Sequence, residues 1–128
     1  MKEKAFEARV KAFLKERGCW VLKTWSNGVQ RSGIPDLLVS CNGFFLGVEL
    51  KAERGVPSEL QVWNIEQIRK SGGIGIVLYP AQFQEFVKLI NYIQNLNPVG
   101  SEVNQELFDE RMKKNEVVRN RQRNNELY

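Results

Sequence analysis

The chain has 128 residues, of which 42% are apolar, a composition that suits one globular domain with its own core. Its 19 basic and 15 acidic residues leave a formal charge of +4, which is compatible with a nucleic-acid partner but does not require one. The absence of histidine excludes histidine-based nucleases, Ser-His-Asp hydrolases and most catalytic zinc sites. Any chemistry must therefore rely on carboxylates, lysine, water and hard metal ions.

The chain shows no sign of a membrane span or of export. No apolar run of about 18 residues occurs. The opening stretch MKEKAFEARVK is charged and lacks an apolar signal core, so we expect a cytoplasmic protein. Two cysteines, Cys19 and Cys41, make no disulfide framework, and we expect both to be reduced structural thiols.

The first elements in the chain are a helix and a strand. A helix is predicted over residues 2–17, where apolar side chains recur on one face at helical spacing: Phe6, Val10, Phe13 and Leu14. Gly18 then ends the helix. The stretch CWVLKTW, residues 19–25, is the first predicted strand. We expect its Trp20 and Trp25 to belong to the core, with base stacking as the alternative. The polar loop SNGVQRSG follows.

A β-hairpin is predicted next, because Asn42-Gly43 separates two apolar runs and both turn positions favour positive φ. It pairs residues 36–41 antiparallel with residues 44–51. A helix then begins after Ser58, whose capping box is completed by Gln61, and runs to about residue 70. We expect this helix to bury Leu60 and Trp63, with Ile65 and Ile68 as further candidates.

The compact part of the chain closes with one more strand and helix. Gly72-Gly73 precedes a short strand, IGIVLYP, which stops at Pro80. The helix over residues 82–94 is expected to turn these apolar side chains inward: Phe83, Phe86, Val87, Ile90 and Ile93. The element order α-β-β-β-α-β-α predicts an α/β fold, with a mixed β-sheet flanked by helices.

The composition changes at NLNPVGS. We divide the chain into a domain over residues 1–97 and a charged C-terminal tail over residues 98–128. The tail has few core-forming residues, and its acidic residues, from Glu102 to Glu110, come before most of its basic ones, from Arg111 to Arg123. We expect it to be helical or partly disordered, and to pack on a partner or extend a nucleic-acid footprint.

Charged residues in the hairpin form the candidate site. Asp36 lies six residues before Asn42 and Glu49 lies six after Gly43, so a two-residue hairpin places the two carboxylates opposite each other. Lys51 projects to the same face as Glu49, whereas Leu46, Val48 and Leu50 project to the other face. Three charged groups are therefore expected at one end of the sheet.

Two facing carboxylates repel each other unless a cation lies between them. Oxygen ligands with open positions suit Mg²⁺ or Mn²⁺, and a neighbouring lysine can hold an anion or orient a water molecule. These are the requirements of phosphodiester hydrolysis. The alternative is that Asp36, Glu49 and Lys51 are ordinary charges on an exposed strand face.

The motifs GIPDLL and VELK resemble those of the PD-(D/E)XK nuclease superfamily, and more narrowly the virus-type replication-repair nuclease (VRR-NUC) family in its small stand-alone phage or prophage form. The resemblance covers roughly residues 2–90 and implies a restriction-endonuclease-like core. It implies that Asp36, Glu49 and the backbone carbonyl of Leu50 bind the metal, and that Lys51 positions the attacking water.

The resemblance also assigns catalytic roles outside the hairpin. Glu7 matches the family's helix glutamate, with Glu3 one turn earlier as its rival, and Gln61 matches the glutamine that follows Glu-x-Lys. Whether one Gln61 rotamer can serve both this role and the capping box is left open. We expect nucleic-acid contacts from the loop before Asp36 and from two lysines: Gln30, Arg31, Ser32, Lys11 and Lys23. Gly33 suits a close approach of backbone to a ligand.

The function that these features favour is a Mg²⁺- or Mn²⁺-dependent DNA endonuclease. The resemblance implies a homodimer that acts on branched DNA, Holliday junctions included, within a bacterial host cell. The alternatives are a DNA-binding or assembly module without turnover, and a nuclease that acts on RNA or on linear DNA ends.

Overall fold

The computed structural model describes residues 2–25, 33–97 and 105–127. Its elements are, in chain order, α1 (Glu3–Glu16), β1 (Trp20–Lys23), β2 (Leu37–Cys41), β3 (Phe44–Leu50), α2 (Glu59–Lys70), β4 (Ile74–Leu78), the 3-10 turn η1 (Pro80–Gln82), α3 (Phe83–Gln94) and α4 (Gln105–Leu127). The predicted order of helices and strands is confirmed, and so is a helical segment in the tail. Within the described residues, no helix is both long and apolar enough to cross a membrane.

The four strands form one mixed sheet in the order β1-β2-β3-β4. The first three strands run antiparallel, and β4 pairs parallel with β3, which requires the crossover that α2 provides. The β2–β3 turn has positive φ at both Asn42 (51°) and Gly43 (82°). Cys41 therefore pairs with Phe44, and the register predicted from the Asn-Gly turn is confirmed.

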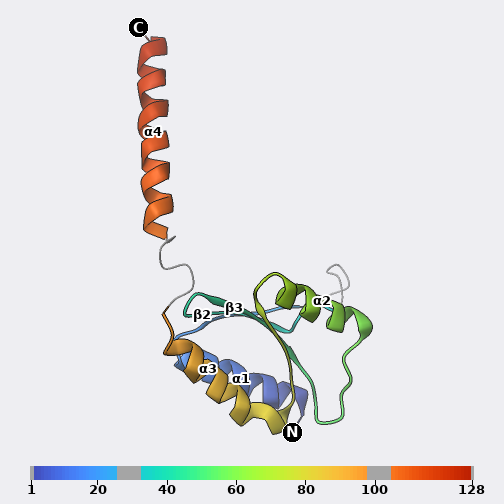
Figure 1. The fold of residues 1–128 in the computed structure, drawn as a ribbon. Helices are drawn as coiled ribbons and strands as arrows, with labels where there is room; N and C mark the ends of the chain where they lie inside the picture. The colour runs from blue at the N-terminus through green and yellow to red at the C-terminus, as the bar shows by residue number, and fades with distance from the viewer. Residues whose placement is uncertain (1, 26–32, 98–104, 128) are drawn as a thin grey trace.

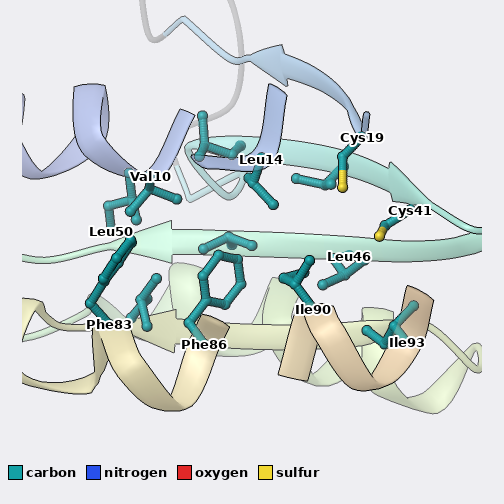
Figure 2. Close-up of a cluster of buried hydrophobic side chains, with 14 of the residues drawn as sticks. Val10, Leu14, Cys19, Cys41, Leu46, Leu50, Phe83, Phe86, Ile90 and Ile93 are labelled. Carbon is teal, nitrogen blue, oxygen red and sulfur yellow. The ribbon is translucent and has the colours of Figure 1, made fainter. Parts of the chain in front are cut away.

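Helices cover both faces of the sheet (Figure 1), with α1 and α3 on one face and α2 on the other. The larger core lies between the sheet and the α1–α3 layer. There Val10 and Leu14 of α1 belong to the same cluster as Phe86 and Ile90 of α3, along β3 (Figure 2). Leu46, Val48 and Leu50 are fully buried there, as their alternation predicts. Burial of this one-sided core holds the strands, and hence the charged end of the hairpin, in place.

Two neighbouring glycines let α2 lie close to the other face. Gly47 of β3 is paired with Gly75 of β4. A Cβ at Gly47 would come within 2.4 Å of Cδ1 of Ile68, and one at Gly75 within 2.6 Å of the backbone oxygen of Ile65. The first turn of α2 is thereby brought down toward the end of β3, where Glu49 lies.

Some core predictions are wrong. Trp20 and Trp25 are 60% and 70% exposed, and on α2 the buried residue is Ile65 rather than Leu60 or Trp63, which are 40% and 53% exposed. For Trp20 the reason is that α2 packs on β3 and β4, so among the described elements it does not extend over β1 on that face of the sheet. The thiols are free and buried as expected, and burial raises the pKa of Cys19 to about 12.

Candidate active site

The hairpin brings Asp36 and Glu49 together at the end of the sheet. The β2–β3 pairing ends with Leu37 opposite Val48, so its continuation sets Asp36 opposite Glu49. The backbone amide of Leu50 donates a 2.9 Å hydrogen bond to Oδ2 of Asp36. Thr24 holds the backbone on the other side, because its amide donates to the Asp36 carbonyl oxygen at 2.9 Å. The predicted facing of the two carboxylates is therefore seen in the structure.

Glu49 is a buried carboxyl group that is only partly satisfied. Its side chain is 2% exposed, and Oε1 lies 3.5 Å from Nζ of Lys51. Oε2 is buried and has no hydrogen-bond partner among the described residues. Burial raises the pKa of Glu49 to about 8, the nearby Asp36 carboxylate adds to the rise, and Lys51 opposes it. A carboxylate in this position gains strongly from a cation.

Gln61 connects the start of α2 to Glu49. Its Oε1 accepts a 2.8 Å hydrogen bond from the Ser58 amide, and its backbone amide donates to Oγ of Ser58 at 3.1 Å, which completes the capping box. Nε2 of the same side chain donates to Oε1 of Glu49 at 3.0 Å. One rotamer therefore serves both contacts, because the amide has a separate acceptor and donor.

Glu7 reaches the site from α1. Its side chain is 21% exposed, and Oε1 lies 2.5 Å from Nζ of Lys23. The same ammonium group lies 3.7 Å from Oδ1 of Asp36. Lys11 contacts the other Glu7 oxygen at 3.8 Å. The rival Glu3 is exposed, so of the two glutamates it is Glu7 that the fold directs toward Asp36.

The two lysines assigned to nucleic-acid contact thus lie beside carboxylates. Burial alone would lower the pKa of Lys23, but the hydrogen bond to Glu7 and the charges of Asp36 and Glu7 outweigh it and raise the pKa. Lys23 is therefore a charged part of the site. The antiparallel pairing of β1 with β2 sets Lys23 opposite Leu37, and this pairing brings Lys23 beside Asp36.

The segment before Asp36 is held by α2. Gly33 has a φ of +95°, and a Cβ there would meet Cγ of Leu60 at 2.6 Å. Nδ2 of Asn64 donates to the Gly33 carbonyl oxygen at 2.9 Å. Gly33 thus lies close to helix α2, whereas an approach of its backbone to a ligand stays a prediction. The predicted phosphate contacts Gln30, Arg31 and Ser32 lie outside the described residues.

The donors present suit a hard divalent ion. Asp36 and Glu49 supply carboxylate oxygens, and the unpartnered buried Oε2 of Glu49 is the kind of atom that a cation would satisfy. Among the described residues, no group of three or more histidine, cysteine, aspartate or glutamate side chains is arranged to hold a metal ion. A bound Mg²⁺ would therefore need water or phosphate oxygens to complete its coordination, as this ion commonly does.

A mixed sheet with Pro-Asp and Glu-x-Lys motifs at one end is the arrangement of the PD-(D/E)XK nucleases. The chain matches the family model for archaeal Holliday junction resolvase (Hjc) over residues 1–75. A solved structure described as a VRR_NUC domain is 37% identical, with 67% of this chain and 95% of that chain covered and a TM-score of 0.51. The chain therefore belongs to the Hjc and VRR-NUC-like family of these nucleases, and its fold is restriction-endonuclease-like.

A more distant likeness is to Archaeoglobus fulgidus Hjc, a Holliday junction resolvase from an archaeal hyperthermophile. The two chains are 21% identical, with 59% of this chain and 67% of that chain covered and a TM-score of 0.46. No curated protein matches the chain.

Proposed function

We propose that the protein is a Mg²⁺- or Mn²⁺-dependent endonuclease that cuts branched DNA. The observation that carries this proposal is the buried Glu49 carboxyl group, which lies opposite Asp36 and beside Lys51 with one oxygen unpartnered. A structural sheet end has no need of two facing carboxylates. A module that only binds DNA would in addition be weakened by negative charge next to phosphates, so the site favours catalysis over binding alone.

In the proposed mechanism, Asp36 and Glu49 would hold the metal ion, with the Leu50 carbonyl oxygen as a further ligand. When bound there, a metal ion would supply Lewis-acid polarisation of a phosphoryl oxygen and would lower the pKa of a water molecule. Lys51 positions that water and stabilises negative charge as it develops on the phosphate. Gln61 holds Glu49 in orientation through its 3.0 Å contact. Glu7 reaches this end of the site from α1 and contacts Lys23, whose ammonium group lies 3.7 Å from Asp36.

The substrate proposal comes from the family. The matched model describes Holliday junction resolvases, and a junction has four arms and needs two paired incisions. A single domain carries one set of catalytic residues, so a two-fold homodimer would supply both cuts. The loop residues Gln30, Arg31 and Ser32, together with Lys11, are proposed to contact phosphates near the cut. A nuclease acting on RNA or on linear DNA ends is the alternative.

The proposal is tested by incubating the protein with junction, flap, duplex and single-stranded DNA and with RNA, with Mg²⁺, with Mn²⁺ or with EDTA. We expect junction cleavage in either metal and none in EDTA. The Lys51→Ala variant should bind junction DNA almost as well as the wild type but should not cut it. Full cleavage in EDTA, or wild-type cleavage by Lys51→Ala, would overturn the metal mechanism. Preferential cleavage of RNA or linear ends would support the alternative substrate.

A further inference from the structure

Lys23 lies between two acidic side chains of the site, Glu7 and Asp36. Its ammonium group contacts Oε1 of Glu7 from α1 and lies 3.7 Å from Oδ1 of Asp36. The Lys23 side chain is 24% exposed, so it is held within the structure rather than extended into solvent. Among the described residues, Lys23 therefore forms ion pairs with both carboxylates, whereas Lys11 pairs with Glu7.

Lys51 already compensates the third carboxyl group, Glu49, at 3.5 Å. Lys23 thus lies beside Glu7 and Asp36, whereas Lys51 lies beside Glu49. A divalent ion that binds Asp36 would bring two positive charges next to the Lys23 ammonium group. Because like charges a few ångströms apart repel each other, the ion and the ammonium group compete for Oδ1 of Asp36.

The Lys23 ammonium group also lies at the long end of a cation–π contact with an aromatic ring. Its Nζ lies 5.9 Å from the centre of the Trp25 ring, and Trp25 is 70% exposed. An ammonium group that leaves Asp36 can move closer to this ring and strengthen the cation–π contact. From there it faces solvent, where DNA phosphates would approach.

From this geometry we infer that Lys23 is a built-in substitute for the metal ion, which neutralises Glu7 and Asp36 in the metal-free protein and must leave Asp36 before a divalent ion binds. Lys23 thereby weakens metal binding and stabilises the metal-free site. Lys23 is a positioning residue. When the metal ion enters, the Lys23 ammonium group is released toward solvent, where it can bind a phosphate. The inference rests on the proposed function, because it assumes that Asp36 is a metal ligand.

The test is to measure Mn²⁺ binding in the absence of DNA, by calorimetry and by the electron paramagnetic resonance signal of free Mn²⁺. Lys23→Met removes the charge but keeps the length of the side chain. We expect it to tighten the Mn²⁺ dissociation constant about tenfold, since it removes a repulsion between close like charges. The metal-free variant should unfold at a lower temperature than the wild type, and added Mn²⁺ should raise its melting temperature more.

Two further variants make the result decisive. Lys23→Gln also removes the charge and serves if Lys23→Met does not fold. Lys11→Met is the matched control, because Lys11 contacts Glu7 at 3.8 Å but makes no ion pair with Asp36. We expect it to change Mn²⁺ affinity less than about threefold, since it leaves Asp36 untouched.

Wild-type or weaker Mn²⁺ binding by both Lys23 variants would overturn the inference while leaving the proposed metal mechanism intact. Equal tightening in Lys11→Met would overturn it as well, because the effect would then reflect net charge alone. If the wild type and every variant fail to bind Mn²⁺ or Mg²⁺, both the inference and the proposed function are wrong.

Discussion

Gln61 contacts two partners with one side chain, and two substitutions separate its roles. Gln61→Ala loses both contacts, so we expect it to cost about 1 kcal/mol in the free energy of unfolding and to slow cleavage. Gln61→Glu keeps an acceptor for the Ser58 amide but replaces the donor that faces Glu49 with a carboxylate oxygen. It should unfold much like the wild type and cut at least as slowly as Gln61→Ala.

The measurements for Gln61 are urea unfolding and the cleavage rate with saturating Mn²⁺. Wild-type cleavage by Gln61→Glu would show that the contact with Glu49 has no catalytic importance. If Gln61→Glu loses as much stability as Gln61→Ala, repulsion from Glu49 outweighs the capping contact that Gln61→Glu retains.

Glu49 gives the metal-free protein a distinctive dependence on pH. Its pKa in the folded protein is about 8, whereas the ordinary value is 4.5. As the pH rises from about 4.5 to about 8, the unfolded chain loses this proton first and the folded state retains it. The free energy of unfolding therefore receives a contribution that is fully present below the lower pKa and is lost as the pH rises through the higher one.

Denaturant unfolding in EDTA across this pH range measures the effect, with Glu49→Gln as the reference that cannot titrate. The wild type should lose stability relative to Glu49→Gln as the pH rises. Mn²⁺ requires the ionised carboxylate, so its affinity for the wild type should increase over the same range. A constant difference between the two proteins across the range would contradict the raised pKa.

At the scale of elements, the contact between α2 and the sheet is the one most sensitive to added volume. A methyl group at Gly75 would meet the Ile65 backbone oxygen, which cannot move without moving the helix. A methyl group at Gly47 would meet Cδ1 of Ile68, the mobile end of a side chain. We expect Gly75→Ala to cost about 2–3 kcal/mol and Gly47→Ala less, as measured by urea unfolding.

The Gly75 substitution should also affect catalysis, because displacement of α2 moves Gln61 away from Glu49. The cleavage rate of folded Gly75→Ala should fall more than that of Gly47→Ala. Equal costs for the two alanine variants would contradict the distinction between a rigid and a mobile neighbour.

The tail is the element whose role the sequence leaves open. Helix α4 is charged, with Phe108 and Met112 exposed at 58% and 42%. A chain that ends at Asn97 should remain folded, because the described core lies entirely before that residue. We expect it to bind DNA with a shallower salt dependence, since it lacks the basic residues that follow Glu110.

Salt titrations of binding and light scattering distinguish the possible roles of the tail. A truncated protein that becomes monomeric and loses paired junction cuts would assign the tail to dimerisation instead. An unfolded truncated protein would refute the proposed boundary after residue 97.

At the scale of the whole molecule, an uncovered apolar surface favours association. Trp20 and Phe45 both pair with Ser40, from opposite sides, and therefore project from the same face of the sheet. They are 60% and 46% exposed. Exposed aromatic side chains on one face, here on either side of Ser40, are typical of interaction surfaces, and two-fold pairing would cover them on both subunits.

We therefore expect a homodimer by sedimentation, and Phe45→Lys should shift it toward monomer and reduce paired junction incisions. Trp63→Lys is the control, because Trp63 is also half exposed but projects from α2. A monomeric wild type, or a Phe45→Lys variant that remains dimeric, would contradict this interface.

The sequence predicted the parts of the protein that depend on local rules. The Asn42-Gly43 turn requires positive φ and so sets the hairpin register, and the register alone brings Asp36 opposite Glu49. Ser58 and Gln61 likewise define the start of α2 by a local capping box. The family resemblance added the expectation that Glu7 faces the site, and the fold places it there.

Only the tertiary structure decided which apolar side chains are buried and which charges meet. Whether Trp20 is covered depends on where α2 crosses the sheet, and the position of α2 depends on the close contacts at Gly47 and Gly75. Lys23 meets Asp36 and Glu7 because β1 pairs with β2 and also packs against α1. Burial and ion pairing arise between elements distant in the chain, whereas turn geometry and capping arise between neighbours, so local sequence patterns predict the second kind and not the first.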